Sequence, residues 1–552
     1  MICNVLFDEE HSENQHLLIV FKYEHPNYGE RLFTFKRSLT ESLECCSKRI
    51  KINLQKAFTG NNKKKNKNLD NTIDFTIKFY RNDNEIYGSI VNNDFWKDGS
   101  TMSINGTDYI IKFNHPHVSE IRLSNVILTG YFTYPYLEII NGNIVDSQFT
   151  WFRSKDSLEW IFVGDGFLYE VKQEDLDHEL KVVCSPRLAE KEGISREVIS
   201  PKTISKGPEN CPFEKSFIHT RENFSNSLRV VSYNLLADLY ANSEYSRDVL
   251  YSYCNDSYLN FSYRKTLLIK ELLGYNADIF FLQELDSIFY RKGLNPILNF
   301  SSYDSYFIAK ESNSEGLCIF YRRSKFECIR AEAHTYSDLL MNNQQFEFLL
   351  QKISENQQLF NRVKKLKNTF QILILKSIEQ PNKLLILCNL HLYSKDDADH
   401  IRLIQTFITI KYVEKCLIEL IQNKNYSHCQ ITTILSGDFN STPEFGVVKF
   451  IKDKKVDSTL EDFKSNESEV IKDFVWQHQL NFESACGFPD YTHYAQHFSG
   501  CLDYIFYDPI GLKVLNVVPM AEHQEVIKEI ALPNQKIPSD HLPLICTFVW
   551  NK

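Results

Sequence analysis

Apolar, strand-length runs that end in polar residues of catalytic type constrain the fold of this chain more than any other feature. Ile431 to Leu435 is apolar and β-branched and predicts a buried strand, which Ser436-Gly437 is expected to end. Asp438 and Asn440 follow, two residues apart, where side chains project from the rim of a sheet. Ser441 to Pro443 predicts the start of a helix, with a Ser or Thr cap and Pro in its first turn.

A carboxylate and an amide in this arrangement serve either a reaction or a turn. In a reaction, Asp438 holds or deprotonates a water while Asn440 donates to an anionic oxygen. An isolated GDFN tetrapeptide is more often an Asx-turn that closes a strand. The rest of the second half favours the reaction, because five further places repeat the pattern. They are Leu228–Tyr233 before Asn234, Asp278–Leu282 before Gln283-Glu284, Leu384–Cys388 before Asn389-Leu390-His391, Asp503 before Tyr504–Tyr507, and Asp540-His541 before Leu542–Phe548.

Each of these places alone has a structural explanation, since a carboxylate at a strand end caps the backbone and a lone His satisfies a carbonyl. If the strands form a two-layer sandwich, however, these strand ends lie together at one end of the sandwich. Carboxylates crowded there repel one another and destabilise the fold by several kcal/mol unless a counter-charge is present. The donors are oxygens and amides without a thiolate cluster, so the pattern predicts a hard cation, Mg²⁺ or Mn²⁺, rather than zinc.

Length and composition set the frame for this site. At 552 residues the chain is too long for one ordinary core, and two or three domains are expected. The net charge of −9 argues against bulk electrostatic binding of nucleic acid but leaves a local basic groove open. The 14 cysteines include no CxxC pair, which argues against a disulfide framework and indicates a reducing compartment. No apolar run reaches the roughly 18 residues of a membrane span, so no membrane partner is expected.

The first half of the chain predicts two regions without a catalytic cluster. Residues 1–70 read as a mixed segment in which Asn61 to Asn68, NNKKKNKN, predicts a solvated loop rather than a nucleic-acid contact, because it has no aromatic neighbours. Residues 71–200 alternate in the manner of strands and predict a β-rich, immunoglobulin-like domain with Trp151 and Cys184 as its core pair. This half is therefore expected to bind or position a partner.

The sequence pattern changes at the start of the second half. Residues 201–227 are rich in Pro and Gly and predict a linker, so 228–552 is the expected catalytic domain. Helical spacing of apolar residues predicts helices at Phe261–Leu273 and Ala398–Ile421, with a shorter one at Ser287–Asn299.

Seven motifs occur in the order of a known family. They are SYNLLAD (232–238), LQELD (282–286), EGLCIFYRRSKF (315–326), NLHLY (389–393), SGDFNSTP (436–443), LDYIFY (502–507) and SDHLPL (539–544). This series resembles the endonuclease/exonuclease/phosphatase superfamily, in particular its deadenylase branch. Four segments are similar to the 2′,5′-phosphodiesterase 12 subgroup. They are FWKDGSTMSINGTDYIIK (95–112), YNADIFFLQELD (275–286), SACGFPDYTHY (484–494) and ALPNQKIPSDH (531–541). The resemblance implies an α+β protein whose C-terminal two-layer β-sandwich, flanked by helices, follows the N-terminal β-rich region.

The resemblance also implies roles for individual residues. The implied metal ligands are Glu284, Asn234 and Asp540. Asp438 would orient and deprotonate the attacking water, His541 would stabilise the charge that builds in the transition state, and Asp503 would orient His541. Asn440 and His391 would grip non-bridging phosphate oxygens.

Three further residues are implied at the substrate. Phe498 would stack on the base, and Tyr491 would add aromatic surface for adenine. Relatives usually have Asn where this chain has His493, so one phosphate or ribose contact is expected to differ.

The implied function is a Mg²⁺-dependent 3′-exoribonuclease, with Mn²⁺ as a substitute ion, that releases AMP from poly(A) and from 2′,5′-linked oligoadenylate. RNA is the expected partner and DNA is not. Two alternatives stay open: a phosphatase of the same superfamily acting on a smaller phosphate ester, and an inactive relative that binds RNA as a scaffold. The subgroup implies the mitochondrial matrix, whereas the acidic stretch Met1 to Glu13 has no Arg or Lys and favours the cytoplasm.

Overall fold

The computed structural model describes residues 1–8, 16–59, 74–87, 89–221, 226–310, 314–457, 459–471 and 474–551. It forms two compact units: Met1–Asn125 with Tyr134–Tyr169 and Asp177–Ile204, and Val126–Thr133 with Glu170–Leu176 and Ser205–Lys552. The predicted loop at 61–68 lies outside the described residues. Among the described helices, none is long and apolar enough to cross a membrane.

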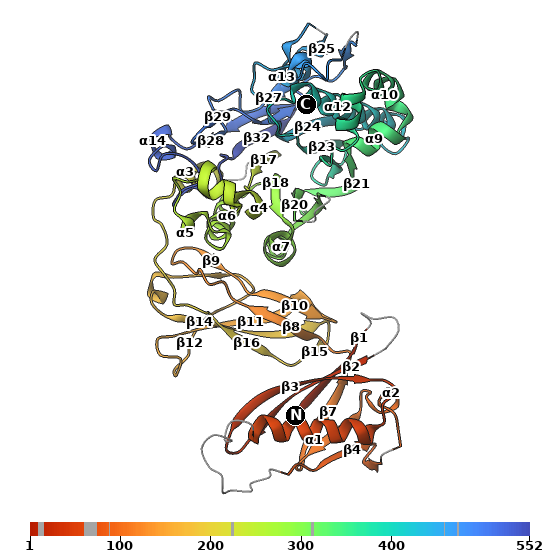
Figure 1. Cartoon of the computed structure of the whole chain (residues 1–552), viewed down its shortest axis with the longest axis vertical. Helices are drawn as coiled ribbons and strands as arrows, with labels where there is room; N and C mark the ends of the chain where they lie inside the picture. The colour runs from red at the N-terminus through yellow and green to blue at the C-terminus, as the bar shows by residue number, and fades with distance from the viewer. Residues whose placement is uncertain are drawn as a thin grey trace. The chain divides into compact units, whose positions relative to one another are not determined.

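A seven-stranded sheet covered by one helix forms the first part of unit 1 (Figure 1). In spatial order its strands are β3 (Gly29–Ser38), β2 (His16–His25), β1 (Ile2–Asp8), β7 (Thr107–Phe113), β6 (Ser100–Ile104), β4 (Ile77–Arg81) and β5 (Asn84–Ile86). Helix α1 (Leu43–Thr59) packs Cys46, Ile50 and Leu54 into the same core as the sheet, because their four-residue spacing puts them on one face. Since β1 pairs with β7, the boundary predicted after residue 70 falls inside this sheet.

The second part of unit 1 is β-rich, as predicted. Its strands are β8 (His117–Arg122) with β10 (Tyr136–Ile140), and β12 (Ile161–Asp165), β11 (Asn143–Ser154), β14 (Glu179–Leu188), β15 (Lys191–Glu192) and β16 (Arg196–Ile199). Trp151 and Cys184 are both buried, but they lie on the neighbouring strands β11 and β14 of one sheet. The two predicted core residues are therefore both in the core, on adjacent strands of the same sheet.

The predicted linker contains a packed helix. Within it, α3 (Pro212–Thr220) begins with Pro212, and the carboxylate of Glu214 accepts from the Cys211 N–H at 3.2 Å. Thr220 Oγ1 donates to the Gly274 carbonyl at 2.8 Å, which ties α3 to helix α6 (Phe261–Tyr275). From residue 205 onward this segment is thus part of unit 2.

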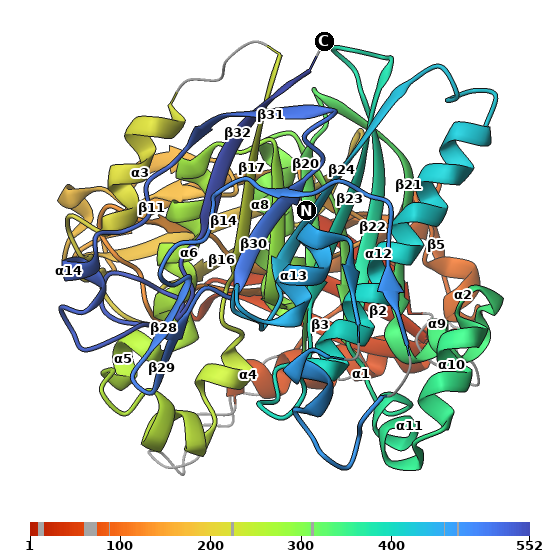
Figure 2. The same ribbon diagram turned by 90° about the horizontal axis from the view of Figure 1, so that it is seen from above.

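Two six-stranded sheets form the centre of unit 2 (Figure 2). The first sheet is ordered β19 (Tyr303–Ala309), β20 (Glu315–Arg322), β18 (Ile279–Asp286), β17 (Ser227–Asn234), β32 (Leu544–Trp550) and β31 (Leu512–Val517). The second is ordered β21 (Phe326–Thr335), β22 (Thr369–Ser377), β23 (Lys383–His391), β24 (Gln430–Asp438), β30 (Asp503–Tyr507) and β27 (Glu483–Ser484). Alternate residues of both sheets share one buried core, which confirms the predicted two-layer sandwich.

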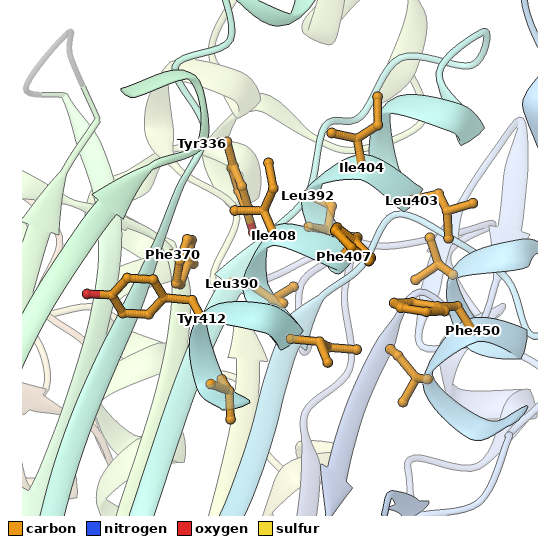
Figure 3. Packing of buried hydrophobic residues seen from close by; sticks show 14 of the residues in the cluster. Tyr336, Phe370, Leu390, Leu392, Leu403, Ile404, Phe407, Ile408, Tyr412 and Phe450 are labelled. Atoms are coloured by element: carbon orange, nitrogen blue, oxygen red, sulfur yellow. The ribbon is translucent and has the colours of Figure 1, made fainter. Parts of the chain in front are cut away.

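Helices cover the outer face of the second sheet. Helix α12 (Asp399–Gln422) packs Ile404, Phe407 and Ile408 with Leu390 of β23 and Phe370 of β22 (Figure 3). The predicted helices at 261–273 and 398–421 are confirmed as α6 and α12. The shorter predicted helix is divided into α7 (Ser287–Phe289), a π-helical turn (Tyr290–Leu294) and α8 (Asn295–Phe300). Further helices are α4 (Asp238–Ala241), α5 (Asp256–Leu259), α9 (Tyr336–Asn342), α10 (Glu347–Ser354), α11 (Gln357–Val363) and α14 (His523–Val526).

The helix predicted to start at residues 441–443 begins later. Helix α13 spans Gly446–Asp453, and the preceding residues form a turn in which Phe445 N–H donates to the Thr442 carbonyl at 3.1 Å. The first N–H of α13 is bonded by the carboxylate of Asp462, at 2.5 Å from Gly446 N. The prediction was wrong because the capping group comes from a residue distant in sequence rather than from Ser441 or Thr442.

Candidate active site

The ends of the central strands bring the predicted site residues to one end of the sandwich. On β23 and β24, the inward positions that carry Leu385, Leu387 and Ile434 continue, two residues at a time, to His391 and Asp438. In the sheet, His391 is paired with Asp438, and Asp438 with Asp503 of the antiparallel strand β30. Three side chains of catalytic type therefore lie on adjacent strands at the same level.

Strand β24 does not end at Ser436-Gly437, as the sequence predicts, but continues to Asp438. Gly437 pairs with Leu390 and with Tyr504, so it lies in the middle of three strands. Its φ is +143°, and a Cβ added there would lie 2.0 Å from the Leu390 carbonyl oxygen. Glycine here is what allows β23 and β24 to stay paired directly before Asp438.

Glu284 reaches the site through an irregularity in β18. Regular alternation points Phe281 and Gln283 inward, and Gln283 Nε2 donates to Asn389 Oδ1 across the sheets at 2.8 Å. The register against β20 shifts between Leu282 and Leu285, and Glu284 has a φ of +53°. This bulge turns the Glu284 carboxylate toward Asn234, to which a regular strand would not direct it.

Asn234 joins the two carboxylates on which the predicted centre depends. Its Nδ2 donates to Glu284 Oε1 at 3.1 Å and to Asp438 Oδ2 at 3.0 Å. The Ala237 N–H donates to the other Glu284 oxygen at 3.0 Å. Asn234 Oδ1 accepts from Leu236 N–H at 3.1 Å, so the amide presents its nitrogen rather than this oxygen to the two carboxylates.

Two imidazoles flank Asp438. His391 Nε2 lies 3.5 Å from Asp438 Oδ2 and 4.0 Å from Glu284 Oε1. His541 Nε2 lies 3.7 Å from the same Asp438 oxygen, and its Nδ1 lies 2.7 Å from Asp503 Oδ2. Asp438 is therefore held between two nitrogen groups, one of which is fixed from behind by a second carboxylate.

A second imidazole–carboxylate pair borders the first. His493 Nε2 lies 3.2 Å from Asp540 Oδ2, which also accepts from the Tyr251 hydroxyl at 2.6 Å. The ring centroids of His493 and His541 are 4.7 Å apart. His493 thus contacts both Asp540 and His541.

The other predicted substrate residues lie at different distances from the cluster around Asp438. The Phe498 ring centroid lies 5.6 Å from that of His493, and the side chain is 48% exposed. Asn440 follows Asp438 in an Asx-turn, with its N–H on Asp438 Oδ1 at 2.9 Å and its Nδ2 on the Leu392 carbonyl at 3.0 Å. Asp438 therefore both closes an Asx-turn and belongs to the cluster of catalytic-type side chains.

Tyr491 is a predicted substrate residue that contacts His523 and Tyr494. Its hydroxyl is 2.9 Å from His523 Nδ1, and its ring lies 4.9 Å from that of Tyr494. These contacts place Tyr491 in a neighbouring apolar cluster with Val526 and Leu532.

Burial raises the pKa values of the two central carboxylates, Glu284 and Asp438. It raises the pKa of Glu284 to about 7, and the nearby Glu315 and Asp540 carboxylates act in the same direction. Burial and the Asp503 carboxylate raise the pKa of Asp438 to about 6, against the opposing charge of His541. Both groups are therefore stabilised in ionised form by a cation placed between them.

The flanking imidazoles are shifted in opposite directions. Burial, with the positive charges of Lys310 and His541, holds the pKa of His391 well below its ordinary value, so its ring is neutral. Burial alone would lower the pKa of His541, but the carboxylates of Asp503, Asp438 and Asp540 together outweigh it and raise that pKa well above the ordinary value. The site thus pairs a neutral imidazole with a charged one on either side of Asp438.

Lys310, Glu315 and Tyr240 form a group beside Glu284 that the sequence reasoning missed. Lys310 Nζ lies 2.5 Å from Glu315 Oε1, which also accepts from the Tyr240 hydroxyl at 3.0 Å. The Lys310 charge opposes the rise in the pKa of Glu284. Glu315 belongs to a quoted motif, but only the pairing of β19 with β20 brings Lys310 beside it.

The donor set fits a divalent cation. The donor atoms of Asp438, Asp503 and His541 lie within 4.8 Å of one another, as do those of His493, Asp540 and His541. Glu284 is connected to Asp438 through a single amide. Buried carboxylates with raised pKa values need a positive charge, and their oxygens suit a hard ion.

Comparison with known proteins agrees with this geometry. The family described as Endonuclease/Exonuclease/phosphatase family matches residues 231–541. The 2′,5′-phosphodiesterase 12 of Rattus norvegicus is 33% identical over 500 residues, which cover 87% of this chain and 81% of the relative. That of Homo sapiens is 32% identical over 495 residues, covering 86% and 80%.

Two less similar proteins match a smaller share of the chain. The CCR4-Not complex 3′-5′-exoribonuclease subunit Ccr4 of Mycosarcoma maydis is 26% identical over 357 residues, or 60% of this chain and 51% of the relative. The solved structure of ANGEL2, described as a 2′,3′-cyclic phosphatase, is 22% identical with a TM-score of 0.47 and covers 59% of this chain and 97% of its own.

Proposed function

The chain belongs to the endonuclease/exonuclease/phosphatase family, and from this premise we propose that it is a Mg²⁺-dependent phosphodiesterase of the 3′-exoribonuclease type. Its substrates are poly(A) and 2′,5′-linked oligoadenylate, from which it releases AMP. The names of the relatives, 2′,5′-phosphodiesterase 12 and a 3′-5′-exoribonuclease subunit, support both the reaction and the substrate class.

One observation carries the reaction. The Asn234 amide nitrogen lies within 3.1 Å of carboxylate oxygens from two strands of different sheets, Glu284 on β18 and Asp438 on β24. His391 and His541 contact the same Asp438 carboxylate, and Asp503 contacts His541, so metal-binding, proton-accepting and hydrogen-bond-donating groups lie together.

Some of these residues would bind the metal ion, and Asp438 acts on the attacking water. Glu284, with Asn234 and Asp540 beside it, would hold Mg²⁺, which when bound neutralises charge on the phosphate and on the leaving oxygen. Asp438 takes the proton of the attacking water, since a pKa of about 6 leaves it ionised at neutral pH yet basic enough to act.

The nitrogen donors serve the phosphate. His541 is charged and fixed through Nδ1, so its Nε2 is available to donate to an oxygen that gains negative charge in the transition state. His391 is neutral and offers a hydrogen bond without a full charge. Asn440 adds an amide beside Asp438.

Recognition of adenine rests on Phe498. Its side chain is half-exposed at the rim of the cluster and can stack on a terminal base without rearrangement of the core. His493, between Phe498 and His541, would then contact the ribose or phosphate of the same nucleotide.

The decisive experiment compares matched oligoadenylates of 2′,5′ and 3′,5′ linkage, with Mg²⁺ present, and measures AMP release. AMP from either substrate supports the proposal. RNA binding without AMP would favour the scaffold alternative, and phosphate release from a small ester without AMP would favour the phosphatase; either result removes the proposal.

We also propose the mitochondrial matrix as the site of action, which is what the sequence resemblance to the 2′,5′-phosphodiesterase 12 subgroup implies. Imaging of the tagged protein expressed from its full transcript tests this. A cytoplasmic signal that excludes mitochondria would overturn it.

A further inference from the structure

Arg264 on helix α6 is completely buried and bonds the backbone on both sides of the site without belonging to the cluster. Its Nε donates to the Leu259 carbonyl at 2.9 Å. Its Nη1 donates to the carbonyls of Leu235 at 3.3 Å, Leu236 at 2.8 Å and Pro538 at 3.2 Å. Arg264 thus bonds Leu235 and Leu236 on one side and Pro538, 274 positions along the chain from Arg264, on the other.

The first of these segments presents a donor to Glu284. Leu235 and Leu236 follow Asn234 directly, and the next residue, Ala237, donates its N–H to Glu284 Oε2 at 3.0 Å. Leu236 has a φ of +55°, a conformation that a γ-branched side chain adopts only when its surroundings impose it. The bond from Arg264 to the Leu236 carbonyl is one of those constraints.

The second segment carries the other half of the site. Pro538 directly precedes Ser539, Asp540 and His541. Ser539 Oγ donates to the Asn234 carbonyl at 2.7 Å and accepts from His541 N–H at 3.1 Å. The two segments are therefore joined twice, once by the Ser539 hydroxyl and once by the Arg264 guanidinium.

The chemistry of the guanidinium suits this task. Its donors are fixed in one plane and stay charged inside the protein, so one group can bind several carbonyls in set directions. A lysine ammonium carries its donors at a single point at the end of a flexible chain. It cannot reach the carbonyls of Leu236 and Pro538 with the same geometry.

We propose that Arg264 is a positioning residue that locks the 235–237 turn to the 538–541 segment and so sets the spacing between Glu284 and His541. Its effect on turnover rests on the proposed function. Its effect on cation binding does not, because that binding is measured without RNA.

Arg229 provides a matched control. It is also buried, at 1% exposure, and its Nη1 donates to the carbonyls of Thr220 at 2.8 Å and Asn276 at 3.0 Å. It lies near the start of β17, whereas Asn234 ends that strand. Arg229→Ala removes a buried guanidinium with backbone partners far from the catalytic end.

The experiment measures three quantities on Arg264→Ala, Arg264→Lys and Arg229→Ala: kcat and KM for AMP release, the affinity for Mn²⁺ alone by electron paramagnetic resonance of the free ion, and thermal unfolding. Both Arg264 variants are expected to lose about 10²-fold in kcat with little change in KM. Their Mn²⁺ affinity is expected to fall about 10- to 100-fold. Arg229→Ala is expected to lose stability while keeping kcat and Mn²⁺ affinity per folded molecule.

Chemical rescue adds a readout that loss of stability would not give. Millimolar guanidinium is expected to restore part of the kcat of Arg264→Ala and to leave Arg229→Ala unchanged. The proposal is overturned if Arg264→Ala keeps both kcat and Mn²⁺ affinity, or if both alanine variants lose them equally.

Ser539→Ala covers the case in which Arg264→Ala fails to fold. It deletes the second link, together with the bond that Ser539 Oγ accepts from His541 N–H, and leaves Arg264 in place. It is expected to lower kcat and Mn²⁺ affinity in the same direction by a smaller factor. Unchanged values in Ser539→Ala would then overturn the proposal. If the wild type releases no AMP but the Mn²⁺ affinities differ as expected, the proposed function fails and the positioning role stands.

Discussion

His541 Nδ1 lies 2.7 Å from Asp503 Oδ2, with both side chains almost completely buried. The same carboxylate oxygen accepts from the Thr492 hydroxyl at 2.6 Å, which fixes its position. The imidazole is thereby held in one orientation, with Nε2 toward Asp438. A charged donor facing the site is the direct result of this pair.

Asp503→Asn is expected to lower kcat about 10²–10⁴-fold with a small change in KM, because it removes the charge that keeps His541 protonated and oriented. Steady-state kinetics of AMP release measure this. Asp508→Asn is the control: Asp508 lies just beyond the other end of β30 and accepts from Ile510 N–H at 2.9 Å, so its loss should leave kcat unchanged. Near-normal turnover by Asp503→Asn would remove the assigned role.

Asp438→Ala and Glu284→Ala are each expected to lower kcat by at least about 10³-fold, since one removes the base and the other the principal cation ligand. Circular dichroism should be unchanged, because neither side chain belongs to the apolar core. Asp304→Ala, which breaks the exposed pair with Arg323, serves as the control and should keep full activity. An active Asp438→Ala enzyme would show that another group activates the water.

Without divalent cations, the free energy of unfolding is expected to fall as pH rises from about 4.5 to about 7. Glu284 has a pKa raised from 4.5 to about 7, so the folded chain binds this proton more tightly than the unfolded chain. Stability from this group is therefore complete below pH 4.5 and is lost as the pH passes through 7.

Glu284→Gln isolates this contribution, which is on the order of 3 kcal/mol. Urea unfolding of both proteins across this pH range, with chelator present, gives the difference. Other buried acids, such as Glu271 with a pKa raised to about 8, contribute equally to both curves and cancel. Parallel curves for the two proteins would contradict the assignment.

Addition of Mg²⁺ is expected to raise the free energy of unfolding more at pH 7.5 than at pH 5, because the ion binds the ionised carboxylates of the folded protein. Thermal unfolding with and without Mg²⁺ at both pH values measures this. The increment should vanish in Glu284→Gln, and an equal increment in that variant would indicate a different binding site.

Phe498→Ala is expected to raise KM for oligoadenylates about ten- to a hundredfold with little effect on stability, because a half-exposed ring stacks on substrate rather than on the core. Phe348→Ala removes another exposed ring, on α10, and should leave KM unchanged. A KM that does not change in Phe498→Ala would exclude base stacking at this position.

The strands and helices of the second half could be predicted because their apolar periodicity is strong. Runs such as Ile431 to Leu435 and Phe261 to Leu273 match β24 and α6 with small differences at the ends. The meeting of Asp438 with His391 and Asp503 follows from the same pattern, since strand ends with period-two alternation share one face.

Features that depend on distant contacts could not be predicted. The inward turn of Glu284 needs the bulge against β20, and the late start of α13 needs the carboxylate of Asp462. The boundary after residue 70 failed because β1 pairs with β7, which follows it by about a hundred positions. Lys310 and Arg264 have no local signal, since a single basic residue in a sequence does not show what it will face.

The paired positions of His391, Asp438 and Asp503 limit how this enzyme can vary. A single residue inserted into β24 would reverse every side chain beyond it and send Asp438 to the helix-covered face, where Leu435 and Phe439 now pack. A change in loop length leaves this alternation intact, but the central strands must keep their residue count. An inserted residue is tolerated only where a β-bulge restores the alternation of side chains between the two faces. Strand β18 already contains such a bulge at Glu284.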